Sequence, residues 1–133
     1  MPKKAMKYTV FISHSSEDKD IANEVAKKLK DSGIETFVDS ASGRRSALGH
    51  VVSRMRKSDE VMVLVSDKSA TKQWPSLDAG LAWGLGKTVT PLIHNIAIGK
   101  LPPTLKSKNL VRTDQFYKYQ AKLQERLLEP ELI

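Results

Sequence analysis

Cysteine is absent from this 133-residue chain, so it has no disulfide, no thiolate metal ligand and no thiol nucleophile. Aromatic residues make up only 6% of the chain, which leaves few rings for stacking nucleic acid bases. Long apolar runs are also absent: the basic start leads into a short strand-like segment, too short for a signal peptide or a membrane span. These shortages predict a cytoplasmic protein with no membrane partner.

The charge is unbalanced, with 22 Lys and Arg against 15 Asp and Glu, a formal net charge of +7. A basic domain is a candidate for nucleic acid binding, because phosphates attract Lys and Arg. Here the positive residues are scattered over helices, loops and the end of the chain, and few aromatic residues accompany them. We therefore expect a solvated basic surface and no nucleic acid partner.

What the sequence does contain is an alternation of apolar strands and helical segments. Compact apolar runs predict strands at 8–13, 34–38, 61–65 and 88–93, with a short edge strand at 109–112. Apolar spacing predicts helices at 21–29, 51–58, 77–85 and 116–127. The run Val61–Val65 is the most apolar and is expected to be the central strand, buried on both faces.

This order of elements predicts an α/β fold: a flavodoxin-like open parallel five-stranded sheet, strand order 2-1-3-4-5, with helices on both faces. The length suits one domain over residues 1–133, with its core at about 7–128. In such sheets ligands bind beyond the carboxyl ends of the strands, where the strand order reverses. That place lies between the first and third strands.

Two sequence patterns suggest sites that their context does not support. The segment Gly84–Thr88 is similar to the end of a phosphate-binding loop, but Leu81 stands where that motif needs glycine. The segment also follows a predicted helix and precedes a strand, which is the reverse of the motif's order. The three histidines are widely spread and lack metal-ligand spacing, so no metal site is expected.

Candidate site residues gather at the predicted carboxyl edge of the sheet. Asp78 is the only carboxylate between Asp67 and Asp114, and it opens the predicted apolar helix. It has two interpretations: a favourable charge in a first helical turn, or an anion at the mouth of a crevice. The residues expected to line that crevice and contact a substrate are Ser13, His14, Ser15, Ser66 and Trp74.

Two segments resemble those of a known family. The segment Tyr8–Asp18 is similar to the opening box of Toll/interleukin-1 receptor (TIR) domains, where an apolar strand precedes Ser-His/Tyr-Ser and an acidic stretch. The segment Trp74–Lys87 resembles a second box, in which an acid follows a Trp by four residues and a small-residue helix ends in Gly-Lys. The loop Asp39–Leu48 lies where the family's BB loop lies. The chain is thus similar to stand-alone bacterial TIR proteins.

The resemblance implies cleavage of NAD⁺ at the nicotinamide–ribose bond, giving ADP-ribose or a cyclised relative, with NAD⁺ as substrate and no cofactor. The family's catalytic acid is a Glu, and Asp78 takes that position here as the expected catalytic residue. Asp is one methylene shorter, about 1.5 Å less reach. Arg44 and Arg45, in the BB-loop position, are candidates to bind the pyrophosphate; a solvated basic loop is the alternative.

Two other functions stay open from the sequence. The chain is alternatively a non-catalytic module that binds other TIR domains through the BB loop and adjoining helices, an interpretation that the Asp at position 78 favours. The NAD⁺-cleaving enzyme of the previous paragraph would instead act in a bacterial defence system and produce a nucleotide signal for a separate effector protein. A nucleoside-processing transferase would use the same hydroxyls and carboxylate, but no further motif supports it.

Overall fold

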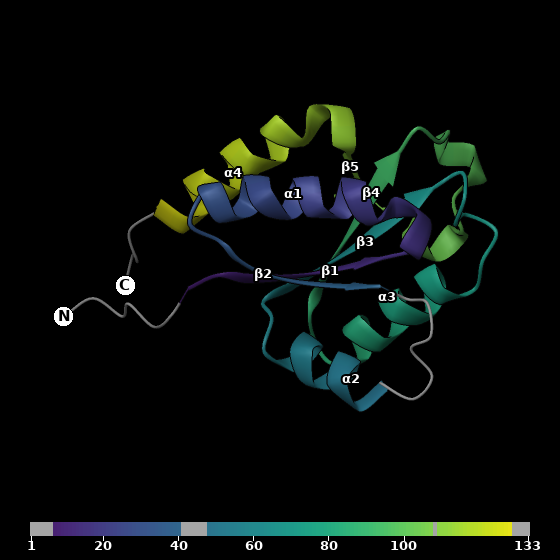
Figure 1. Cartoon of the computed structure of the whole chain (residues 1–133), viewed down its shortest axis with the longest axis horizontal. Coiled ribbons are helices and arrows are strands. Elements are labelled where there is room, and N and C mark those ends of the chain that lie inside the picture. Colours follow the sequence, from purple (N-terminus) through teal and green to yellow (C-terminus); the bar gives the residue numbers. More distant parts are fainter. Residues whose placement is uncertain (1–6, 41–47, 108, 129–133) are drawn as a thin grey trace.

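A computed structural model describes residues 7–40, 48–107 and 109–128. These residues form one parallel sheet of five strands in the order β2-β1-β3-β4-β5, with helices on both faces (Figure 1). The predicted fold class and strand order are confirmed. The strands are β1 (Thr9–His14), β2 (Glu35–Ser40), β3 (Glu60–Ser66), β4 (Thr88–His94) and β5 (Val111–Arg112); the helices are α1 (Lys19–Asp31), α2 (Leu48–Arg56), α3 (Trp74–Gly84) and α4 (Phe116–Leu128).

The central strand β3 is buried along its whole length, as its apolar run predicts. Its side chains alternate between the two faces of the sheet because the side-chain period of a strand is two. Val61, Val63 and Val65 join the apolar cluster that contains residues of α2 and α3. Met62 and Leu64 join the cluster under α1 and α4. Figure 1 shows these two helical layers, α1 and α4 on one face and α2 and α3 on the other.

Helix α3 begins at Trp74, three residues before the predicted start at Leu77. Pro75 accounts for the earlier start, because proline suits the first helical turn, where a missing N–H removes no helical hydrogen bond. Asp78 is therefore the fifth residue of the helix, and the first turn carries no acidic residue. The interpretation of Asp78 as a charge in the first turn, favoured by the helix dipole, is wrong.

The glycine-rich segment after α3 is a helix stop. Gly86 has a φ of +76°, in the left-handed region that glycine adopts without steric cost. Its N–H donates to the carbonyl of Trp83 at 2.9 Å, and the N–H of Lys87 donates to that of Ala82 at 3.0 Å. Strand β4 starts at the next residue, Thr88. The glycines therefore turn the chain from helix to strand, and the segment is not a phosphate-binding loop.

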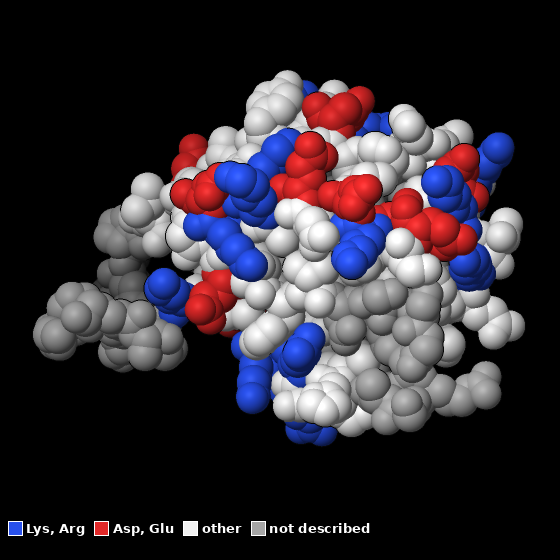
Figure 2. Space-filling view, in the orientation of Figure 1, with Lys and Arg blue, Asp and Glu red and all other residues white. Residues whose placement is uncertain are grey.

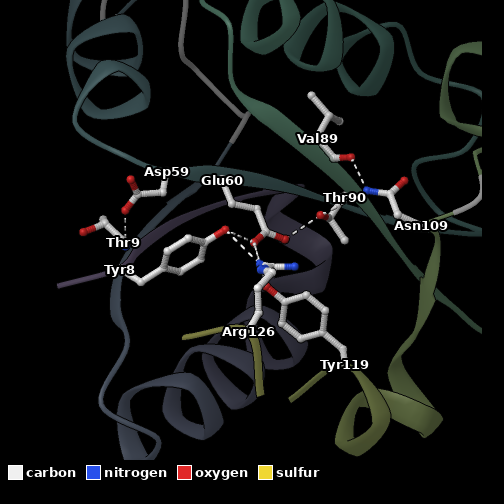
Figure 3. A network of polar contacts seen from close by, with 9 residues as sticks. All are labelled: Tyr8, Thr9, Asp59, Glu60, Val89, Thr90, Asn109, Tyr119 and Arg126. Atoms are coloured by element: carbon white, nitrogen blue, oxygen red, sulfur yellow. Dashed lines mark hydrogen bonds and ion pairs between the residues drawn. The ribbon is translucent and has the colours of Figure 1, made fainter. Parts of the chain in front are cut away.

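A buried carboxylate joins α4 to the sheet (Figure 3). Glu60, the first residue of β3, is 1% exposed. Its Oε1 accepts hydrogen bonds from the hydroxyls of Tyr8 at 2.7 Å and Tyr119 at 2.9 Å. Its Oε2 accepts a hydrogen bond from the hydroxyl of Thr90, and the guanidinium of Arg126 in α4 forms an ion pair with Oε1 at 3.8 Å. The carboxylate thus connects the start of β1, the middle of β4 and two turns of α4.

This network makes the stability of the fold sensitive to alkali. Burial raises the pKa of Tyr8 and of Tyr119, and the neighbouring Glu60 carboxylate raises both further. The unfolded chain loses these protons above its ordinary tyrosine pKa of about 10, whereas the folded chain keeps them. The stabilisation is complete below about pH 10, and the free energy of unfolding should fall above it, by at most about 1.4 kcal/mol per pH unit per tyrosine.

Urea denaturation at closely spaced pH values across about pH 9–11 measures this slope. Tyr119→Phe should make the slope shallower, and Tyr8→Phe should do so less, because water screens the half-buried Tyr8. Tyr117, which is 63% exposed on the same helix, is the matched control, and Tyr117→Phe should leave the slope unchanged. An equal slope in the Tyr119→Phe variant would contradict the expected proton linkage.

Candidate functional site

Ser13 and Asp78 meet at the carboxyl edge of the sheet. Ser13 shares a face with Phe11 because side chains of a strand alternate, and Phe11 belongs to the cluster under α2 and α3. Ser13 therefore points to α3, which carries Asp78. Its hydroxyl donates a hydrogen bond to Oδ2 of Asp78. Ser13 is completely buried and Asp78 is 6% exposed. The Asp78 carboxylate is therefore nearly enclosed, and it lies at the carboxyl edge of the sheet.

A second buried carboxylate, Asp18, lies at the same edge of the sheet. Its Oδ2 accepts the hydroxyl of Ser66 at 2.7 Å and that of Ser15 at 3.2 Å, and Asp18 is 2% exposed. From the sequence, Asp18 is assigned only to the acidic stretch at the end of the first box. It does take the N-cap position of α1, but its side chain makes no capping hydrogen bond. The only feature of the sequence that could have pointed to Asp18 is its place in the first box, three residues after Ser15.

The two carboxylates lie on opposite faces of the sheet. Ser66 shares its face with Met62 and Leu64, which pack under α1 and α4, so it points to the start of α1. Ser13 points the other way, to α3. The structure therefore divides the predicted residues into two groups. Ser13 contacts Asp78, whereas Ser66 and Ser15 both contact Asp18, which was not predicted.

His14 belongs to the second of these groups. Its side chain follows Ile12 on the α1 face, and its Nδ1 lies 2.6 Å from the backbone oxygen of Ser15. At 3% exposure the ring is nearly enclosed. The hydrogen bond fixes the orientation of the imidazole beside the loop between β1 and α1. His14 thus helps hold the polar turn that carries Ser15.

Trp74 lies on α3, one turn before Asp78, so both residues share one side of the helix. Its indole is partly buried and packs against the cluster under α2 and α3. Trp83, nine residues further along the chain, is 47% exposed. Arg44 and Arg45, the candidates for pyrophosphate binding, lie outside the described residues.

The loop after β3 is fixed by its own hydrogen bonds. The N–H of Ser66 donates to the hydroxyl of Ser69 at 3.1 Å, and the N–H of Lys68 donates to the hydroxyl of Ser66 at 3.1 Å. At the surface, Lys72 of this loop lies 3.2 Å from Glu17, beside the first turn of α1, and lowers the pKa of that carboxyl. The two loops that flank the site are therefore tied to each other by an exposed ion pair.

The described part of the chain contains neither a cluster of metal ligands nor a helix suited to a membrane. No three histidine, aspartate or glutamate side chains of residues 7–40, 48–107 and 109–128 gather closely enough to hold a metal ion. None of the described helices has the length and apolar content that a membrane span requires. On the face drawn in Figure 2, blue and red side chains are mixed over the upper part, and the few coloured side chains at the bottom are blue.

Comparison with known proteins identifies the family. A family model described as TIR domain matches residues 10–128, and the chain belongs to this family. The TIR domain of the Toll-related receptor TRR-2 from Hydra magnipapillata is 21% identical, with a TM-score of 0.68 over 92% of this chain and 100% of that one. A 3-dehydroquinate dehydratase-like protein from Bifidobacterium longum is 12% identical, with a TM-score of 0.58 over 92% and 99%. The comparison with curated proteins gives no match.

Proposed function

We propose that this TIR-domain protein is a cytoplasmic enzyme that cleaves NAD⁺ at the bond between nicotinamide and ribose. The observation that carries the proposal is the buried Asp78 carboxylate, bonded to Ser13 at the switch point between β1 and β3. Asp78 also takes the position at which the family's catalytic Glu stands. The product would be ADP-ribose or a cyclised relative, which would act on a separate effector protein.

The reaction suits a single carboxylate. The bond between the ribose C1′ and the pyridinium nitrogen breaks, its electron pair stays with nicotinamide, and a ribosyl cation resembling an oxocarbenium ion develops. Water captures this cation in hydrolysis, and a nucleophile of the same nucleotide captures it in cyclisation. Nicotinamide leaves as a neutral molecule, so no second carboxylate is needed as an acid. Asp78 would stabilise the positive charge from within a nearly enclosed environment, where electrostatic interactions are strong.

Asp78 would also position the ribose. The Ser13 hydroxyl shows where a hydroxyl donor contacts the carboxylate, and a ribose hydroxyl is a donor of the same kind. Ser15, Ser66, His14 and Trp74 would contact other parts of the nucleotide, with Arg44 and Arg45 at its pyrophosphate. The shorter Asp side chain, about 1.5 Å less than Glu, requires the sugar to lie closer to α3 than in a Glu enzyme.

The direct test is incubation of the protein with NAD⁺ at high protein concentration, with and without a crowding agent, while free nicotinamide is measured by chromatography. Release of nicotinamide that scales with protein and time is the expected result. The crowding arm favours self-association, which is typical of TIR domains. No nicotinamide release under either condition would reject the enzyme proposal.

The alternative function, binding of other TIR domains, has its own observation. Leu77 and Trp83 of α3 are 66% and 47% exposed, and the exposed Gly80 lies between them on the outer side of the helix. Exposed large apolar side chains beside a small residue are typical of a surface that a partner covers. As a scaffold, the protein would use this side of α3 to bind a second TIR domain.

We expect the double substitution Leu77→Gln and Trp83→Gln to weaken self-association by about tenfold or more, since one anchor residue often contributes more than 1 kcal/mol. Sedimentation equilibrium over a range of protein concentrations measures the effect. Leu128→Gln is the matched control, because Leu128 is 77% exposed on α4. A protein that stays monomeric at all concentrations, or equal weakening by the control, would reject the scaffold proposal.

A further inference from the structure

A polar cavity lies at the opposite edge of the sheet from Asp78. Its volume is about 340 Å³, within the range of small-molecule sites. Glu60 and Thr88, which line it, are the first residues of β3 and β4, whereas Ser13 and Ser66 lie near the carboxyl ends of β1 and β3. Parallel strands place their amino ends at one edge, so this cavity is separate from the candidate catalytic site. Nothing in the proposed reaction uses it.

The cavity has an excess of positive charge. Its lining includes Arg112 of β5 and Lys118, Lys122 and Arg126 of α4, against one carboxylate, Glu60. The charge of Glu60 is already compensated by Arg126 at 3.8 Å, and its oxygens accept three hydroxyls. Within residues 7–40, 48–107 and 109–128, no carboxylate pairs with Arg112, Lys118 or Lys122. Three cationic residues therefore line the cavity with no ion-pair partner among the residues that the structure describes.

The positions of these cations suit one anionic group. Lys118 and Lys122 are four residues apart on α4, so their side chains share one side of the helix. Arg112 reaches the same cavity from β5, across from the helix. A phosphate monoester carries up to two negative charges and presents three acceptor oxygens, so it can accept hydrogen bonds from more than one of these cationic side chains. A single carboxylate would satisfy fewer of them.

The remainder of the lining is suited to an organic group. Leu110, Val111 and Leu123 contribute apolar surface, and Tyr119 contributes its ring. Asn109 is fixed at the rim, where its amide donates to the backbone oxygen of Val89 at 2.8 Å (Figure 3). Apolar walls with a few convergent polar groups are the usual composition of a ligand site. We propose that this cavity binds a small phosphate ester, with the phosphate at Lys118, Lys122 and Arg112.

The test uses the whole chain and phenyl phosphate as the probe. Backbone amide signals are followed by NMR at constant ionic strength, with inorganic phosphate and phenol as separate arms. Saturable shifts are expected in residues 109–112 and 118–126, with phenyl phosphate binding more tightly than either fragment alone. Absence of saturable shifts, or shifts confined to residues near Asp78, would overturn the proposal.

Charge-matched variants separate a site from general attraction. Lys118→Gln with Lys122→Gln should weaken phenyl phosphate binding by about tenfold or more, because two charge-assisted contacts are removed. Lys30→Gln with Lys57→Gln removes the same charge from exposed lysines outside the cavity lining and should leave the dissociation constant unchanged. Equal weakening in both double variants would show non-specific binding to a basic surface and overturn the proposal.

Discussion

Replacing Asp78 with asparagine is expected to abolish the release of nicotinamide from NAD⁺ while the fold stays intact. Asparagine has nearly the same size and keeps an oxygen that accepts the Ser13 hydroxyl, so the buried contact is preserved. The negative charge, however, is lost. Removing one group that stabilises transition-state charge typically costs about 3 kcal/mol, a factor of roughly 10²–10³ in kcat. Asp78→Ala should be equally inactive, with a further loss of stability of about 1 kcal/mol or more from the lost hydrogen bond between Ser13 and Asp78.

The measurement is the initial rate of nicotinamide release at saturating NAD⁺, with circular dichroism and urea denaturation as checks of folding. Asp67→Asn is the matched control, because Asp67 is an exposed carboxylate in the loop after β3. It should retain full activity. If Asp78→Asn cleaves NAD⁺ at the original rate, the catalytic group lies elsewhere and the assignment of Asp78 is wrong.

Asp78→Glu separates an enzyme adapted to aspartate from a scaffold. In an adapted enzyme the extra methylene, about 1.5 Å, displaces the carboxylate, and misplacement on this scale can cost up to roughly 10²-fold in rate. In a scaffold derived from an enzyme, the same change restores the family's acid and can create measurable cleavage. The direction of the change in nicotinamide release therefore discriminates the two functions.

The sheet is predictable because each strand is a continuous apolar run. Val61–Val65 has no polar residue, so burial on both faces and a central place follow from composition alone. Element ends are less predictable. The strand extends to Glu60 and Ser66, because backbone pairing with β4 continues through both residues. Polar residues at strand ends give no apolar signal, and these two carry the buried hydrogen bonds.

The site is predictable only in part, because sequence spacing does not give the face to which a side chain points. The switch-point rule places Ser13 and Ser66 at the same edge, and the structure confirms this location. Their opposite directions follow from register, in which Ser13 pairs with Val63, on the α2 and α3 face. Asp18 escapes prediction because a carboxylate before a helix normally caps it, whereas here it accepts two serine hydroxyls.

The network around Glu60 is likewise not predictable from the sequence, because its members are far apart along the chain. Its hydroxyl partners come from positions 52, 30 and 59 residues away, and no motif joins them. The sequence shows two adjacent acids, Asp59 and Glu60, before an apolar strand, and acids at a strand end are usually solvated. The structure instead encloses Glu60 under α4. The contribution of this acid to stability can be measured by replacing it.

Glu60→Ala is expected to destabilise the protein by about 2–5 kcal/mol, because each buried hydroxyl left without an acceptor costs about 1–3 kcal/mol. The hydroxyls of Tyr119 and Thr90 lose their acceptor, and Arg126 loses its counter-ion. Urea denaturation measures the free energy of unfolding. Amide hydrogen exchange should quicken first in α4, because Glu60 joins this helix to β3 and β4. Glu125→Ala, at an exposed position of α4, is the control and should change the stability by no more than about 0.5 kcal/mol.

Replacing the whole network should cost much less than removing its centre. In the variant Tyr8→Phe, Glu60→Leu, Thr90→Val and Tyr119→Phe, no hydroxyl or charge of the original hydrogen-bonded set stays buried without a partner. Apolar replacements of buried ionic groups are often neutral or stabilising, because the desolvation cost disappears together with the attraction. We expect this variant to be more stable than Glu60→Ala. If the two are equally destabilised, packing around position 60 holds α4 in place, and the hydrogen bonds of Glu60 contribute little.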